Sequence, residues 1–316
     1  MKPIFSILAL VCLFAACTGP AQPKTGWGLP GTLPELLAPG TISTDLYERD
    51  FALSPDGSLL IFSRGDARQT RRVLLAMQHS DEGWMEAEVL PFSGRHQDIE
   101  PFFSPDGAWL YFASDRRMDA DSSRTDYNIW KVAYREGQWG EPQALDTVIN
   151  QAGDEFYPSV TSDGDLYFTA TREGGPGRED IYVSSPEAGG YGPARALDTT
   201  VNTALFEFNA YINPDGNLLV FSSFGRSDGL GGGDLYYSRK DSTGNWQASR
   251  NLGAPVNTER LEYCPYVDLE AGILYFTSER RTEADSAIGS ADALEQYARR
   301  IENGLGNIYH LRWTPE

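Results

Sequence analysis

Apolar and polar positions along the chain follow one pattern that recurs five times. A turn rich in Pro, Asp and Gly precedes a short apolar run, as in SPDGSLLIFSR from Ser54 and SPDGAWLYFASDR from Ser104. A second apolar run follows, such as NIWKV at Asn128, and then an aromatic residue ahead of another turn, such as Trp139. Short β-rich runs separated in this way predict strands joined by tight turns. The five units begin at Phe51, Pro101, Pro158, Ala210 and Pro265, at intervals of 50 to 57 residues.

Four short strands in a repeat of this length are the signature of a β-propeller blade. The expected fold class is therefore all-β, a five-bladed β-propeller, with a six-bladed ring containing one degenerate unit as the alternative. The fifth unit ends at RWTPE without a fourth strand, whereas TGWGLPGTLPEL from Thr25 matches QWGEPQAL, the fourth-strand segment of the second unit. We therefore expect the N-terminal segment to supply the last strand of the final blade, which would remove the open sheet edges.

The fifth unit contains an insertion over about 282–304, between its second and third predicted strands. Apolar residues recur there at helical spacing, and Asn303-Gly304 is a plausible stop signal, so the insertion is expected to form a helix. It is either a cap packed on a neighbouring loop or a lid or partner-docking helix. The residues at helical spacing are Ile288, Ala291, Leu294, Tyr297, Ala298 and Ile301.

Residues 1–17, MKPIFSILALVCLFAAC, contain one Lys and then an apolar run too short to cross a bilayer as a helix. This is the pattern of a signal peptide. Its end, LFAAC, resembles the bacterial lipobox, so Cys17 is expected to be lipidated; a plain secretory signal is the alternative. The expected domains are a lipoprotein signal peptide over 1–17, a tether over 18–26 and a single propeller over 27–316.

This signal implies a location in the cell envelope, with a lipid anchor in the outer membrane and the propeller either periplasmic or exposed at the surface. The chain has 45 Asp and Glu against 26 Lys and Arg, a net charge of −19. Such a surface disfavours flat contact with an anionic membrane, so the lipid is the expected membrane contact. The charge also argues against nucleic acid as a partner, because phosphate binding needs a basic surface.

Candidate chemistry is sparse. Three Cys and three His are too few for a structural zinc site or a multi-disulfide scaffold. The chain contains no HExxH motif, and no GxSxG elbow that joins a predicted strand to a predicted helix. We therefore expect no cofactor and no metal, and assign no catalytic residue.

The SPDG-x-x-LYF-x-S-x-R repeats followed by DIY resemble the TolB-type, WD40-like propeller repeats of bacterial envelope proteins. The resemblance covers nearly the whole chain after the signal segment. It implies the fold and an envelope location but little about activity, because this repeat occurs in colicin-translocation proteins, in peptidoglycan-associated lipoproteins and in prolyl-oligopeptidase-type peptidases. The chain departs from the pattern in its first unit, which lacks DIY, and in its fifth, which has LEAG at the place of SPDG.

One face of the predicted propeller collects charge, because the loops entering the first strand and leaving the second strand of each blade lie on the same side. These charges could form a ligand platform, since guanidinium groups suit carboxylates and phosphates. Alternatively each Arg pairs with an acid of its own or a neighbouring blade and locks the loops, as expected of a feature present in every repeat. The acids are Glu48, Asp98, Glu155, Glu207 and Glu262, and the arginines are Arg64, Arg116, Arg172, Arg226 and Arg280.

A second column on this face differs between the units and is therefore the better guide to a site. It lies two residues after each acid, and regular strand alternation would place it on the same side as the acids. Asp50 and Glu100 could do acid/base work at the channel mouth, or simply form a polar lining. The column consists of Asp50, Glu100, Tyr157, Asn209 and Cys264.

The leading functional hypothesis is a non-catalytic, lipid-anchored propeller that binds a protein or glycan partner of the bacterial envelope through this charged face. The alternative is a glycan-active hydrolase that uses the channel-mouth carboxylates Asp50, Glu100 and Glu155. The oligomeric state is not predicted.

Overall fold

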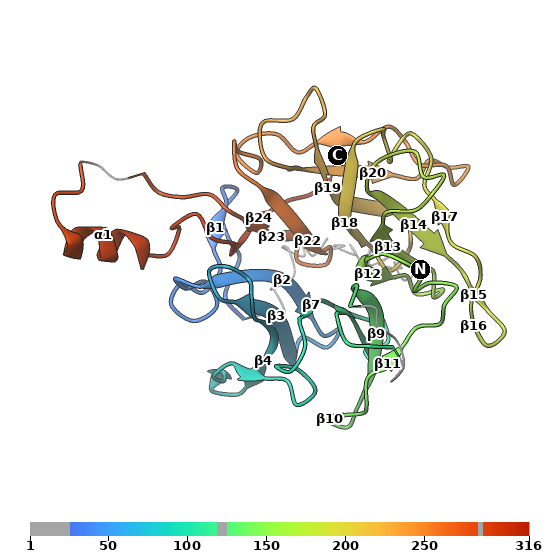
Figure 1. The fold of residues 1–316 in the computed structure, drawn as a ribbon, viewed down its shortest axis with the longest axis horizontal. Coiled ribbons are helices and arrows are strands. Elements are labelled where there is room, and N and C mark those ends of the chain that lie inside the picture. The colour runs from blue at the N-terminus through green and yellow to red at the C-terminus, as the bar shows by residue number, and fades with distance from the viewer. Residues whose placement is uncertain (1–25, 119–124, 284–286, 316) are drawn as a thin grey trace, which may run out of the picture.

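The structure is a computed structural model that describes residues 26–118, 125–283 and 287–315. In these residues, five antiparallel sheets stand around a central axis, and each sheet is one blade (Figure 1). The expected five-bladed β-propeller is confirmed, and the six-bladed alternative is wrong.

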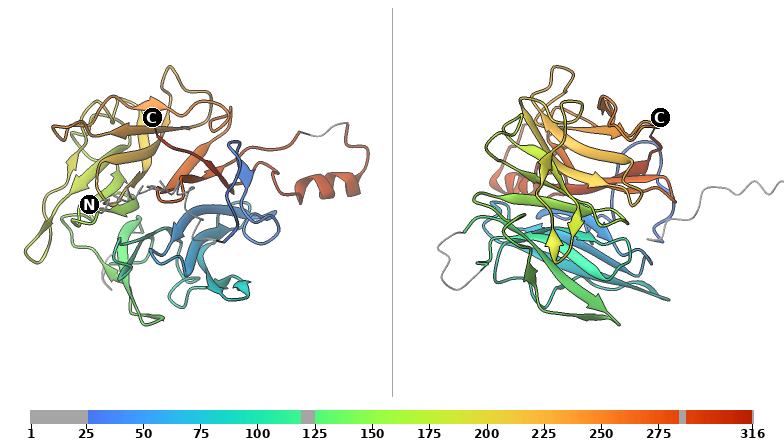
Figure 2. Two further views of the ribbon diagram at one scale, coloured as in Figure 1. Left: turned by 180° about the vertical axis from the view of Figure 1, so that it is seen from behind. Right: turned by 90° about the vertical axis from the view of Figure 1, so that its right-hand side faces the viewer.

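Each blade has its inner strand at the axis and its other strands toward the rim, and in blades one to four the strands follow outward in chain order (Figure 2). Blade one contains β2 (Tyr47–Leu53), β3 (Leu59–Gly65), β4 (Arg72–Ser80), β5 (Gly83–Trp84) and β6 (Glu88–Val89), and blade two contains β7 (Asp98–Phe103), β8 (Trp109–Ser114), β9 (Asn128–Arg135), β10 (Gln138–Trp139) and β11 (Gln143–Ala144). Blade three contains β12 (Glu155–Val160), β13 (Leu166–Ala170), β14 (Asp180–Ser184) and β17 (Arg195–Ala196), beside a small hairpin of β15 (Pro186–Glu187) and β16 (Gly190–Tyr191). Blade four contains β18 (Phe206–Ile212), β19 (Leu218–Phe224), β20 (Asp234–Arg239) and β21 (Arg250–Asn251).

Blade five joins the two ends of the chain. It contains β22 (Glu262–Asp268), β23 (Ile273–Ser278), β24 (Asn307–Arg312) and, at its outer edge, the N-terminal strand β1 (Glu35–Leu36). Glu35 lies opposite His310 and Leu36 opposite Tyr309 in this antiparallel pair. The expected closure by the N-terminal segment is confirmed.

The SPDG segments form the turns that the sequence predicts. In blade one, the N–H of Gly57 donates to the carbonyl of Ser54 at 2.8 Å, and Gly57 has a φ of 74°. Asp56 accepts hydrogen bonds from the N–H of Ser58 and from the hydroxyl of Ser54. The Asp side chain and the Gly backbone therefore both hold the turn closed.

The core lies between neighbouring blades and repeats with them. The Phe of each LYF run, or its equivalent, sits on the second strand and is fully buried. Blade contacts are reinforced at the start of the inner strands, where the N–H of Glu207, for example, donates to the carbonyl of Glu179 in the preceding blade. The five buried residues are Phe62, Phe112, Phe168, Phe221 and Phe276.

The insertion in blade five contains the expected helix, α1 (Ala291–Ala298), which is shorter than the helical pattern suggested. Ser290 caps it by accepting a hydrogen bond from the N–H of Ala293. α1 projects away from the propeller (Figure 1). No residue of α1 is buried and Leu294 is 54 % exposed, so the interpretation of the helix as a packed cap is wrong. Among the described residues, no helix has the length and apolar character needed to cross a membrane.

Candidate functional site at the axis

The five acids that begin the inner strands are buried and paired with arginines of their own blades. Glu207 accepts hydrogen bonds from the backbone and hydroxyl of Thr203, from Ser223 and from Arg226. Each guanidinium also lies over the buried Phe of its blade. This is the locking arrangement of the two proposed from the sequence. The distances are 2.8 Å for Glu48–Arg64, 2.5 Å for Asp98–Arg116, 3.2 Å for Glu155–Arg172, 3.0 Å for Glu207–Arg226 and 3.4 Å for Glu262–Arg280.

The variable column two residues further on does not follow regular strand alternation. Its five members all have positive φ, between 49° and 62°, and the inner strand of each blade shifts register at this point. Every inner strand therefore contains a β-bulge, which re-aims the side chains. They contact one another across blades and form what we call the central ring, made of Asp50, Glu100, Tyr157, Asn209 and Cys264.

The central ring is a network of hydrogen bonds between blades. Asp50 accepts from the N–H of Glu100 at 3.0 Å, and Glu100 accepts from the N–H of Tyr157 at 2.7 Å and the amide of Asn209 at 3.2 Å. Arg49 donates to Asp50 Oδ1 at 2.9 Å and to Glu100 Oε1 at 2.5 Å. Burial raises the pKa of Glu100, while the charge of Arg49 opposes this shift. Arg49 is thus the cation that keeps two buried carboxylates together.

A pocket of about 250 Å³ opens above the central ring, on the face where the inner strands begin; we call it the axial pocket. Phe156, Phe208 and Tyr263 contribute aromatic rings to its walls, and Glu100 and Asn209 of the central ring also line it. Apolar walls with a few convergent polar groups are typical of ligand sites.

Arg72 brings a guanidinium group to this pocket, and its charge opposes the rise in the pKa of Glu100 that burial causes. It lies at the start of β4, donates hydrogen bonds to the Tyr127 hydroxyl and to Gln97, and stands over the Tyr127 ring. Within the described part of the chain it forms no ion pair, in contrast to the five arginines of the repeat. The guanidinium therefore retains capacity to bind a polar ligand group.

Glu179, which lies just before β14, contributes a carboxyl group from blade three to the wall of the pocket. No described residue donates a hydrogen bond to this carboxyl group. Burial, followed by the negative charges of Glu100, Asp154 and Asp180, raises its pKa to about 7. A carboxyl group in a pocket with a raised pKa is a common property of functional sites.

We expect the Glu179 carboxyl to titrate near pH 7, because the folded protein disfavours its ionised form. Since its pKa is higher in the folded than in the unfolded state, its contribution to stability is present at low pH and is lost as the pH rises from about 4.5 to about 7. Carbon-detected NMR of ¹³C-labelled Glu, with Glu179→Gln to assign the signal, measures this directly. Asp154→Asn should lower the midpoint, and a wild-type midpoint near 4.5 would contradict the expectation.

The structure brings together only part of the set predicted from the sequence. Glu100 and Asn209 line the axial pocket and the rest of the central ring supports its floor, whereas the five acids and their arginines stay within the blades. Sequence reasoning missed the column directly before the central ring, which also varies between blades and could have been found by that variation. It consists of Arg49, Ile99, Phe156, Phe208 and Tyr263.

The fold and site together define a five-bladed β-propeller whose axis is closed by a polar ring beneath an aromatic pocket. No family model matches the chain. A tricorn protease homologue of Streptomyces coelicolor is 39% identical over 72 residues, which is 22% of this chain and 6% of that protein, so the chain spans only a small part of this relative.

Solved structures show the fold alone. A structure of BT0996, described as an RGII complex, has a TM-score of 0.57 and 10% identity over 91% of this chain and 93% of its own. TolB from Agrobacterium tumefaciens has a TM-score of 0.49 and 16% identity over 76% of this chain and 72% of its own. A GH43 endo-arabinanase from Bacillus licheniformis also has a TM-score of 0.49, with 14% identity over 86% of this chain and 93% of its own.

Proposed function

We propose that the protein is a non-catalytic binding protein of the bacterial cell envelope, anchored by lipid at Cys17, that holds the end of a glycan in the axial pocket. The signal and lipobox pattern supports the location; Cys17 itself lies outside the described residues. A protein partner is the alternative ligand.

The hydrogen bonds to the carboxylates of the central ring are the observation that supports a non-catalytic role. Asp50 accepts hydrogen bonds from Arg49, Ser63 and the N–H of Glu100. Glu100 accepts from the same Arg49, from the N–H of Tyr157 and from the amide of Asn209. Carboxylates engaged in this way form a rigid floor and are poor proton carriers, because a base must reach the proton that it removes.

The lining of the pocket favours a sugar. Phe208 and Phe156 offer flat apolar surfaces to the C–H face of a sugar ring, while Arg72 and Glu179 offer a donor and an acceptor to its hydroxyl groups. A volume of about 250 Å³ holds a terminal residue of a glycan and leaves the remainder outside.

Isothermal titration calorimetry with defined oligosaccharides of peptidoglycan and lipopolysaccharide, and with random-sequence peptides, tests this function. We expect at least one oligosaccharide to bind, and Phe208→Ala to weaken it by about tenfold or more, since the ring loses about 1–3 kcal/mol of contact. Phe224→Ala, a half-exposed ring of the same blade outside the pocket lining, is the matched control and should bind normally. If only peptides bind, and Phe208→Ala weakens their binding, the ligand of the axial pocket is a protein partner and not a glycan. Equal loss of oligosaccharide binding in both variants would show that the site is not the axial pocket.

Glycan hydrolysis is the second candidate, because Glu179 and Glu100 line one pocket and both have raised pKa values. Glycosidases use two carboxyl groups in one site, one of which has a raised pKa and donates a proton. Release of reducing ends in the same mixtures distinguishes the candidates. If the protein is a hydrolase, Glu179→Gln abolishes turnover and retains binding.

A further inference from the structure

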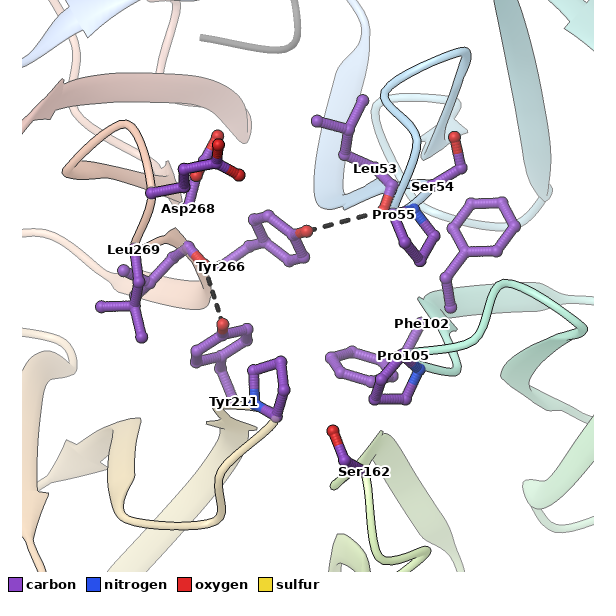
Figure 3. A pocket seen from close by; sticks show the side chains of 14 residues that line it. Leu53, Ser54, Pro55, Phe102, Pro105, Ser162, Tyr211, Tyr266, Asp268 and Leu269 are labelled. Carbon is purple, nitrogen blue, oxygen red and sulfur yellow. Dashed lines mark hydrogen bonds between the residues drawn. The ribbon is translucent and has the colours of Figure 1, made fainter. Parts of the chain in front are cut away.

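A second cavity, of about 370 Å³, opens at the opposite end of the axis, among the turns between the first and second strands of the blades (Figure 3). We call this side of the molecule the turn face and the cavity the turn-face cavity. It shares no lining residue with the axial pocket, and the central ring lies between them. Its volume falls in the range of small-ligand pockets.

Aromatic rings held in fixed positions line the turn-face cavity. The hydroxyl of Tyr211 donates to the carbonyl of Val267 at 2.8 Å, and that of Tyr266 to the carbonyl of Leu53 at 3.5 Å (Figure 3). The two rings pack edge to face, with centroids 5.3 Å apart, and Phe102 stands beside Tyr211. With their hydroxyls engaged in the wall, these side chains offer mainly ring surface to an occupant.

The charged residues described as lining this cavity, Asp268 and Glu270, are both acidic. Each of the five turns has an acid near its tip, and no Lys, Arg or His is among the residues described as lining the cavity. Hydrogen bonds from Ser54 and Ser104 help to hold the pKa of Asp56 and Asp106 below the usual value, so these carboxylates stay ionised. A ring of like charge around a concave surface concentrates ions of opposite charge. The turn acids are Asp56, Asp106, Asp163, Asp215 and Glu270.

Blade five breaks the symmetry of the turn face. At the position of Ser54 it carries Asp268, and at the position of Pro55 it carries Leu269, which is 44 % exposed. Asp268 Oδ1 accepts from the N–H of Ala271 at 3.0 Å. Its Oδ2 accepts no hydrogen bond from any described residue, although the side chain is only 9 % exposed.

A buried carboxylate oxygen without a donor is costly and needs an explanation. Asp268 lines the cavity, and its charge, after burial, contributes to the raised pKa of Tyr266. The unsatisfied acceptor, the aromatic rings and the exposed Leu269 therefore meet in one place (Figure 3). Together they provide an apolar surface next to the Asp268 carboxylate, which forms no ion pair with a described residue.

We propose that the turn-face cavity binds a lysine or arginine side chain of a partner polypeptide, with the hydrocarbon stem against Tyr211, Tyr266 and Leu269 and the charged group directed to Asp268. Cations are attracted both by carboxylates and by the faces of aromatic rings. The ring of turn acids favours a polypeptide segment over a lone amine, because neighbouring basic residues can reach the other turns. This site is separate from the axial pocket and does not depend on the function proposed for it.

A positional-scanning hexapeptide library, in which each pool has one position fixed as Lys, Arg, norleucine or Glu, tests the proposal. We expect the full chain to retain Lys and Arg pools at least tenfold better than norleucine or Glu pools at low salt. Retention should fall as salt is raised, because the attraction is electrostatic. Equal retention of all the pools would overturn the site. Retention of cadaverine, a lone amine, as strong as that of the Lys pools would overturn the preference for a polypeptide.

Matched variants place the binding on the cavity. Asp268→Ser installs the residue that two other turns carry at this position, and Asp268→Asn keeps the shape; both should reduce retention of Lys pools at least tenfold while circular dichroism remains unchanged. Asp292→Asn, which removes an exposed acid of α1, and Phe208→Ala in the axial pocket should retain the pools like the unaltered protein. Unaltered retention by both folded Asp268 variants would overturn the site.

Discussion

Replacing Arg49 with methionine is expected to lower the free energy of unfolding at pH 7 by about 3–5 kcal/mol. Methionine has a similar length but leaves Asp50 and Glu100, which are 1 % and 3 % exposed, without their shared cation. An uncompensated buried charge is much more costly than the loss of the contact itself. Urea unfolding followed by tryptophan fluorescence measures the change.

The pH dependence of this variant separates charge from packing. Glu100 already has a raised pKa in the folded protein, so its stabilising contribution is present at low pH and is lost as the pH rises above the unfolded value of 4.5. Removing Arg49 strengthens this dependence, and we expect the variant to lose less stability at pH 5 than at pH 7.5. Adding Glu100→Gln should restore part of the loss at pH 7.5. A small loss of stability that is equal at both pH values would show that Arg49 does not compensate the buried charges of Asp50 and Glu100.

Replacing Glu207 with alanine is the second change expected to be severe, at about 3–5 kcal/mol of unfolding free energy. The substitution leaves Thr203, Ser223 and Arg226 without their shared acceptor at a site that is 0 % exposed. Thermal and urea unfolding measure the loss. Glu259→Ala is the matched control, because Glu259 is 80 % exposed and its ion pair with Arg260 spans 3.6 Å.

This variant also tests the role of the acid and arginine columns. If they lock the blades, Glu207→Ala loses stability and the folded fraction still binds at the axial pocket. If they form a ligand platform, ligand binding is lost while the melting temperature stays unchanged, and the structural interpretation fails.

The five-bladed architecture was predictable because several independent sequence signals in each repeat indicate the same fold. Pro, Asp and Gly specify the turn, the LYF run supplies the buried Phe of each second strand, and the missing fourth strand of the last unit requires the N-terminal segment. Each signal occurs several times, so an irregular copy such as LEAG did not obscure the count of blades.

The site was less predictable because it depends on a deviation from regular structure. Asp50, Glu100 and Tyr157 adopt positive φ without being Gly, and nothing in their residue types demands it. The assumption of regular alternation therefore placed Arg49 and the equivalent residues of the other blades outside the site, whereas the β-bulges bring these residues to the axis. Glu179 was missed because it precedes the DIY run and looks like an ordinary loop acid until the ring closes around it.

The packing of α1 was also not predictable from the sequence. The apolar spacing predicted a helix with a packed face, but among the described residues neither Leu294 nor Tyr297 is buried. An amphipathic pattern indicates a helix and does not supply the surface against which it would pack.

The pairing of β1 with β24 also constrains the order in which the molecule folds. β1 is the first strand of the domain to be synthesised, yet its partner is the last, so it must wait unpaired while the four complete blades form from local hairpins. Closing the ring then requires the most distant contact in the sequence, and contacts of this kind are slow to form. We therefore expect a late kinetic step in which an almost complete ring exposes the edge of β24, and this intermediate is the state in which another copy of β1 could insert.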